Sequence, residues 1–156
     1  MREILFRAKR TDNGEWINGY YVRQDETSYC FKEDYESHPE NTKHYIAFDM
    51  QTDWGLPNRH LVTEIDPETL CQYTGLTDKN GNPIWENDIV KCNKRKDGFE
   101  LYKVLWRKYY ADFGVEPLDF GVQYPISLGE NEQDIKGCNY EIIGNIFDNP
   151  ELLKGE

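Results

Sequence analysis

The pattern of apolar and polar residues along the chain is that of short strands, and the densest run of strand-forming residues lies between residues 64 and 92. There, Cys71–Thr74, Ile84–Glu86 and Ile89–Cys92 are rich in strand-forming residues. Asn80-Gly81 is typical of a tight hairpin turn, because both residues tolerate positive φ. Asn87-Asp88 predicts a bend. We expect a hairpin that runs into a bent strand.

Similar patterns predict further elements. Asp12-Asn13-Gly14 joins strand-like residues 4–8 and 16–22 into a second hairpin. Short helical turns are expected after Asp66 and Asn149, which each precede Pro-Glu as helix caps do. Residues 33–41 have the composition of a loop. The remaining strands are expected at 29–31, 45–48, 61–65, 99–106 and 140–147.

These elements predict a mainly β fold. We expect a small twisted sheet or partly open β-barrel, SH3-like in style, of roughly six to eight strands with short helical turns and a short C-terminal helix. The 11 Tyr, 7 Phe and 4 Trp supply bulky residues for a sheet core, although only 38% of the residues are hydrophobic. The length of 156 residues fits a single domain, 1–156, with a variable polar insertion at about 23–60.

The charge of the chain restricts its partners. With 29 acidic and 18 basic residues the net charge is −11, which disfavours direct binding to nucleic-acid phosphates. No apolar run is long enough to cross a membrane, and the first residues do not have the pattern of a signal peptide. We therefore expect a soluble cytoplasmic protein without a membrane partner.

Motifs that carry chemistry are missing from the sequence. It contains no P-loop, dinucleotide fingerprint or nucleophile elbow, and the glycine of Asp78-Lys79-Asn80-Gly81 is misplaced for an EF-hand loop. Glu86 and Asp88 would share one face of a regular strand, as an acid and base pair requires, but charges beside a turn are far commoner. We predict no catalytic residue and no cofactor.

No metal site is predicted either. The four cysteines lie far apart in the sequence, so we expect reduced and mostly buried thiols. The three histidines do not have zinc-site spacing, and His38 and His44 are expected to face solvent. The cysteines are Cys30, Cys71, Cys92 and Cys138.

A basic and aromatic stretch supplies the candidate partner contacts. A positive cluster follows Cys92, and a second basic pair at the end of the strand 99–106 is followed by aromatic residues. Segment 109–128 is either one wall of the core or an exposed surface where aromatic side chains act as anchors. The candidate contacts are Lys94, Arg95, Lys96, Arg107, Lys108, Tyr109, Tyr110 and Phe113.

The sequence from 66 to 90 resembles the YopX family of phage and prophage proteins. The matching residues are Asp66-Pro67-Glu68-Thr69, Gln72-Tyr73-Thr74-Gly75-Leu76, Asp78, Gly81, Ile84-Trp85-Glu86 and Asp88-Ile89-Val90. Residues 2–8 and 143–153 agree with the same family. Asn87 stands where the family usually has Gly, and Asn is the residue that best replaces Gly at positive φ. The resemblance implies a single YopX-like domain in a phage or prophage setting, without an established biochemical activity.

Three hypotheses of function follow. The first is a non-enzymatic accessory factor of the bacterial host cytoplasm that binds a host or phage protein. The second is an acidic mimic of nucleic acid that inhibits a host DNA-binding protein, which requires carboxylates aligned on one face. The third is an enzyme whose site is assembled from distant residues. Edge strands and aromatic faces are also compatible with homo-oligomerisation.

Overall fold

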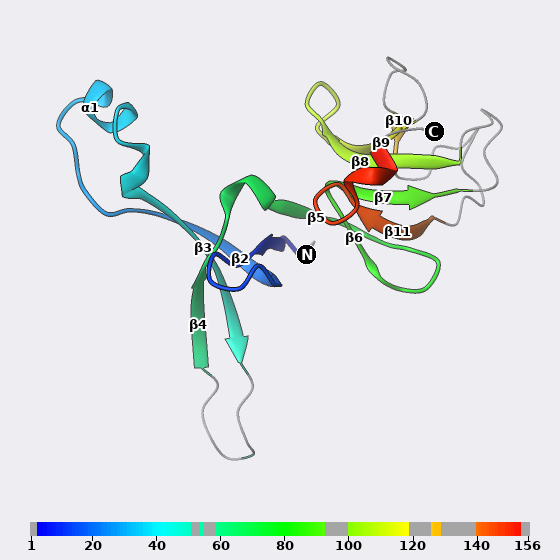
Figure 1. Cartoon of the computed structure of the whole chain (residues 1–156), viewed down its shortest axis with the longest axis horizontal. Helices are drawn as coiled ribbons and strands as arrows, with labels where there is room; N and C mark the ends of the chain where they lie inside the picture. Colours follow the sequence, from blue (N-terminus) through cyan, green and yellow to red (C-terminus); the bar gives the residue numbers. More distant parts are fainter. Residues whose placement is uncertain are drawn as a thin grey trace. The chain divides into compact units, whose positions relative to one another are not determined.

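A computed structural model describes residues 3–50, 54, 59–92, 100–118, 126–128 and 140–153 (Figure 1). The chain forms two compact units, an N-terminal unit of residues 3–72 and a C-terminal unit that contains residues 73–156. The division falls inside one strand, β5 (Cys71–Thr77). The single domain with an insertion at about 23–60 stays a prediction.

The N-terminal unit is an antiparallel sheet with the strand order β4-β3-β2-β1. Its strands are β1 (Phe6–Lys9), β2 (Trp16–Asp25), β3 (Thr42–Met50) and β4 (Arg59–Glu64). β1 and β2 form the predicted hairpin, with Gly14 at φ 72° in the turn. The first two residues of β5 pair with β1 through Phe6↔Gln72 and Arg7↔Cys71.

Short helices replace the loop predicted at 33–41, and the strand predicted at 29–31 is absent. α1 (Lys32–Glu36) is held by an ion pair between its first and last residues, 3.1 Å apart and one turn apart on the helix. η1 (Pro39–Asn41) starts with a proline, which has no N–H to leave unsatisfied at a first helical position. The loop prediction was wrong because the local polar composition hid these helix-starting features, and the strand prediction was wrong because no strand ladder of the described residues includes 29–31.

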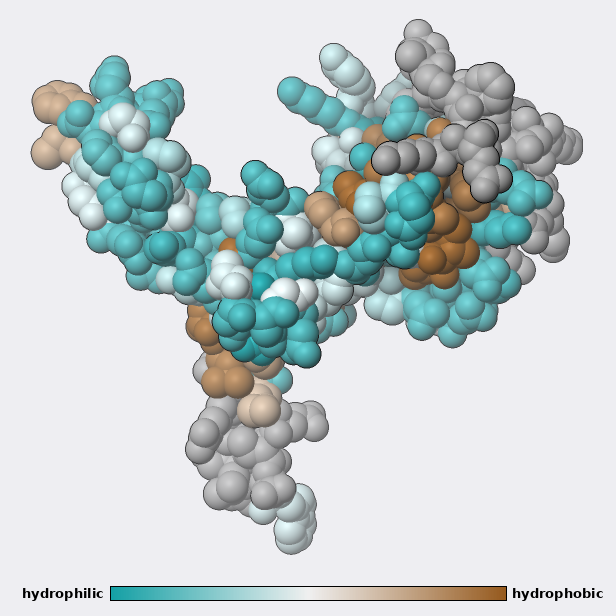
Figure 2. Space-filling model, viewed as in Figure 1, coloured by the Kyte–Doolittle hydropathy of each residue, from teal (hydrophilic) through white to brown (hydrophobic). Residues whose placement is uncertain are grey.

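The core of the N-terminal unit lies on one face of its sheet. Ala8, Ile46 and Ile65 are buried there, with Phe6, Ile17, Tyr21 and Leu70 packed against them. The cross-strand row Tyr20–Ala47–Val62 belongs to the opposite face, because side chains alternate along a strand. Tyr20 and Val62 are exposed on it, and apolar residues along β3 and β4 are visible in brown in Figure 2.

The C-terminal unit contains a five-stranded antiparallel sheet with the order β10-β9-β8-β7-β11. Its elements are β6 (Pro83–Trp85), β7 (Asp88–Lys91), β8 (Leu101–Arg107), β9 (Asp112–Pro117), β10 (Ile126–Ser127), β11 (Glu141–Asn145) and η3 (Pro150–Leu153). β6 pairs with β5 as the other half of the central hairpin. The core includes Val90, Tyr102, Val104 and Val115.

The mainly β fold is confirmed, but the two sheets of the described chain are open and neither closes into a barrel. Eleven strands lie in the described residues, more than the six to eight expected. Two of these strands, β9 and β10, lie in segment 109–128, where the sequence analysis predicted no strand. The described part of the chain has no helix long and apolar enough to cross a membrane.

The turn between β5 and β6 is built around a buried carboxylate. Asp78 is 6% exposed and accepts hydrogen bonds from the backbone N–H groups of Asn80 and Asn82, each at 2.8 Å. Gly81 has φ 86°, whereas Asn80 does not have the positive φ that the predicted two-residue turn requires. The hairpin is therefore confirmed with a longer turn, in which a single left-handed glycine suffices.

The bend between β6 and β7 is confirmed at Asn87, whose φ is 65°. Its N–H donates to the Val104 carbonyl at 2.9 Å, and its carbonyl accepts from the Ile146 N–H at 3.1 Å. Asp88 is 1% exposed, and its Oδ2 accepts from the Trp85 N–H at 2.8 Å. Asn thus occupies the left-handed position at which the family usually has Gly.

We predict that Gly19→Ala destabilises the N-terminal unit. A Cβ at position 19 would lie 2.3 Å from the carbonyl oxygen of Ala47 on the paired strand β3, so the backbone would have to move. Overpacking of this kind costs about 1–3 kcal/mol in the free energy of unfolding, measurable by urea denaturation. Asn18→Ala, at an exposed neighbouring position, is the control. Equal stability of the two variants would refute the close approach.

Candidate functional site

The predicted partner contacts that the structure describes lie in and beside the β8–β9 turn. Arg107 ends β8, Lys108, Tyr109 and Tyr110 form the turn, and Phe113 is the second residue of β9. The other three contacts, Lys94, Arg95 and Lys96, lie outside the described residues. The structure therefore brings the second half of the predicted set together on one hairpin.

An arginine fork closes this turn. Arg107 and Asp112 are the last directly paired residues of the two strands. Arg107 Nε donates to Asp112 Oδ1 at 2.7 Å, and Nη2 donates to Oδ2 of the same carboxylate. The hydrogen bond and charge of Arg107 hold the pKa of Asp112 below its usual value, and Asp112 raises the pKa of Arg107. Such a bidentate pair fixes direction as well as distance.

The fork leaves the aromatic side chains of the turn at the surface. Tyr109 is 97% exposed and Tyr110 is 72% exposed. The Tyr110 ring lies under the Arg107 guanidinium, 4.4 Å from its carbon to the ring centroid, so this ring has a defined place. Lys108 is also exposed. The turn consequently presents two tyrosines and one lysine from a braced backbone.

Phe113 has a different position from the tyrosines. It is 7% exposed and belongs to the core of the C-terminal unit, where its ring packs edge-on against Trp106 at 5.0 Å between centroids. Val115 and Leu128 are also buried. Segment 109–128 therefore begins as exposed surface and continues as core in its described part, so both alternatives hold for different residues.

Gly114 makes the fork possible. A Cβ at this position would lie 2.5 Å from Arg107 Cδ and 2.5 Å from the carbonyl oxygen of Ile126 on β10. The missing side chain thus gives space to the aliphatic stem of Arg107 between two strands. Ser127 of β10 adds a hydrogen bond to Asp112 Oδ2 at 3.3 Å.

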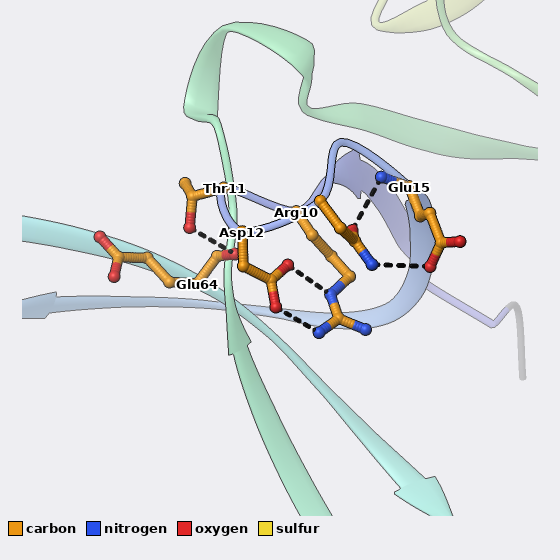
Figure 3. A network of polar contacts seen from close by, with 6 residues as sticks. Arg10, Thr11, Asp12, Glu15 and Glu64 are labelled. Carbon is orange, nitrogen blue, oxygen red and sulfur yellow. Dashed lines mark hydrogen bonds and ion pairs between the residues drawn. The ribbon is translucent and has the colours of Figure 1, made fainter.

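The turn between β1 and β2 has a similar fork without aromatic residues. Arg10 Nε donates to Asp12 Oδ1 at 2.9 Å, and the Thr11 hydroxyl donates to the Glu64 carbonyl at 3.4 Å (Figure 3). The hydrogen bond from Arg10 holds the pKa of Asp12 below its usual value. Residues 10–15 of this turn include no aromatic side chain, so an arginine fork alone is a turn-closing device and does not mark a binding surface.

Glu86 and Asp88 do not form the pair that a regular strand would give. The left-handed residue between them separates β6 from β7, and Asp88 is turned inward to the Trp85 N–H. Asp88 is consequently part of the framework of the C-terminal unit.

The described residues contain no group of His, Cys, Asp and Glu side chains that could hold a metal ion. His38 is exposed, as predicted, and stacks on Tyr29 with 5.5 Å between ring centroids. Cys30 is exposed and Cys71 is buried. Cys92 is disulfide-bonded, so the expectation of reduced thiols was wrong there.

Two adjoining hollows lie in the N-terminal unit, and the sequence analysis missed them. The first hollow, about 300 Å³, is formed by β2, β3 and the α1–η1 segment, and the second, about 490 Å³, lies between η1, β3, β4 and η2. Both are lined by Pro39, Thr42 and His44. The half-buried His44 has its Nδ1 2.7 Å from the Tyr21 hydroxyl. The prediction that His44 faces solvent was therefore only partly right. The predicted strand began at residue 45, whereas β3 begins at Thr42 and includes His44.

Comparisons with known proteins extend over almost the whole chain. The family model described as YopX protein matches residues 5–154. No curated protein matches the chain. Among solved structures, the crystal structure of protein EF1440 from Enterococcus faecalis is similar with a TM-score of 0.50 and 22% sequence identity, over 99% of this chain and 100% of that one. This likeness concerns the fold.

We predict that Asp112→Asn loosens the β8–β9 turn at neutral pH. The folded-state pKa of Asp112 is lowered, so its contribution to stability is complete above the unfolded-state pKa and is lost as pH falls through the folded-state value. Because the carboxylate is partly exposed, we expect a loss of about 1 kcal/mol at pH 7 and a smaller difference near pH 3, measured by urea denaturation. A difference independent of pH would contradict the assignment.

Proposed function

The chain belongs to the YopX family, and on that premise we propose that it is a non-enzymatic accessory factor, of phage or prophage origin, that binds another protein through the β8–β9 turn. The observation that carries the proposal is the exposure of Tyr109 and Tyr110 on a turn braced by Arg107 and Asp112. Tyrosine on a fixed backbone supplies a large contact area at a small cost in conformational entropy.

The bracing of the turn supports a binding role in a second way. Association is weakened when loops must become ordered on binding. Here the fork, the stacking of Arg107 on Tyr110 and the hydrogen bond from Ser127 fix the turn within the chain itself. Exposed Lys108 adds one positive charge at the edge of the aromatic pair. The partner surface is accordingly an apolar pocket with an acidic rim.

The nucleic-acid mimic is less well supported by the placement of the carboxylates. A mimic needs carboxylates that are available on one face, at the spacing of phosphates. In the described chain, many are used internally: Asp78 and Asp88 are buried, and ion pairs occupy Asp12, Asp25, Glu36, Glu64, Glu100, Asp112 and Glu141. These pairs are distributed over both units.

The experiment that tests the proposal is capture from host lysate with the tagged full chain, followed by mass spectrometry. We expect one protein to be retained in stoichiometric amount. With that protein purified, Tyr109→Ala/Tyr110→Ala should weaken binding roughly 30-fold, because truncation of a central aromatic anchor costs about 2 kcal/mol or more.

Tyr20→Ala is the matched control, since Tyr20 is an exposed tyrosine on β2. It should leave the affinity unchanged. An empty capture, or a partner held equally by the double variant, would overturn the proposal. A retained DNA-binding protein that duplex DNA displaces would favour the mimic instead.

A further inference from the structure

We propose that the two hollows of the N-terminal unit form a binding site for a lysine or arginine side chain of a partner polypeptide. The site is distinct from the β8–β9 turn and stands independently of it. Together the hollows have the size of a typical ligand site, several hundred Å³, and they share the wall formed by Pro39, Thr42 and His44. The chemistry of the lining then decides which ligand is accommodated.

Apolar groups line both hollows beside the polar ones. The first contains the rings of Tyr21 and Tyr35, and the second contains Ile65 together with Pro39 and Pro67. Surfaces of this kind accommodate the methylene stem of a long basic side chain, which packs along apolar groups while its charged end stays with polar ones. Apolar surfaces do not distinguish such a stem from other aliphatic chains. The charges of the lining must therefore determine which ligand binds.

The charges of the lining can be accounted for completely. Arg23 pairs with Asp25 at 3.4 Å, and Lys43 pairs with Glu64 at 3.6 Å, so each cation of the lining already has a carboxylate. Glu36 pairs with Lys32 at 3.1 Å. Two carboxylates of the second hollow remain, Glu40 and Asp66, and neither forms an ion pair within the described part of the chain. The uncompensated charge of the site is therefore negative.

The chain itself supplies an example of the expected contact. The guanidinium of Arg23 lies over the Tyr35 ring, 5.4 Å from the centroid, with the Asp25 carboxylate beside it. A basic side chain in this hollow thus combines an aromatic face with a carboxylate. In the second hollow proline side chains take the place of the aromatic face: a partner's lysine or arginine would lay its stem against Pro39 and Pro67 and direct its head toward Glu40 and Asp66.

The test is an NMR titration of the full chain with acetyl-Gly-Lys-Gly amide and acetyl-Gly-Arg-Gly amide. We expect saturable shifts at Thr42, His44 and Ile65 with both peptides. The same peptide with norleucine in place of lysine keeps the stem and lacks the charge, and it should give no saturable shift. Titration with spermidine tests whether the ligand is a small polyamine instead of a peptide side chain. If spermidine binds at least as tightly as the peptides, the assignment to a polypeptide is overturned.

Variants of the two carboxylates complete the test. Glu40→Gln/Asp66→Asn should weaken lysine peptide binding by at least roughly fivefold, because two exposed charge interactions are lost. Asparagine keeps the acceptor that caps η2, where Asp66 Oδ1 accepts from the Glu68 N–H at 3.0 Å, so the fold is retained. Glu68→Gln, an exposed carboxylate outside the hollows, is the control. Equal binding by the double variant and wild type would refute the proposal, whatever the fate of the β8–β9 turn.

Discussion

The buried carboxylate of Asp78 is the interaction on which the C-terminal unit depends. Its Oδ1 accepts from two N–H groups of its own turn, and its Oδ2 accepts from the side chain of Asn82 and from the backbone N–H of Ile142 on β11. Burial alone would raise the pKa of Asp78, but these hydrogen bonds outweigh it and hold the pKa below its usual value. One side chain thus accepts hydrogen bonds from the N–H groups of the central hairpin turn and connects that turn to a strand some 60 residues away in sequence. An unsatisfied N–H at such a place would be costly.

The polar residues of the stretch from 66 to 90 likewise have structural roles in its turns. Asp66 caps η2, Asp78 organises one turn, Asp88 is turned inward at the next, and Asn87 supplies the left-handed bend between β6 and β7. A chain with only 38% hydrophobic residues has small cores, and side chain to backbone hydrogen bonds define its turns. These residues therefore define the architecture of the turns, and Asp66 in addition lines the second hollow.

Most of the fold could be predicted from the sequence because hairpin signals are local. Asn-Gly and Asp-Asn-Gly turns, strand-forming runs and Asp-Pro-Glu caps each act over a few residues, and the corresponding elements were found. α1 was missed because a five-residue helix has no apolar period to detect. The basic and aromatic character of the β8–β9 turn was also readable, but the inward direction of Phe113 depends on strand register. The hollows around His44 depend on the packing of η1 and η2 near β3, which no local pattern encodes.

A carbon-detected NMR titration of the Asp78 carboxyl group tests the central claim most directly, because it reports on the hydrogen bonds that organise the C-terminal unit. The account predicts that the pKa of Asp78 lies below that of an ordinary aspartate, and that protonation of Asp78 coincides with loss of the β5–β6 hairpin signals. Titration at the ordinary value, with the hairpin signals unchanged, would contradict the account.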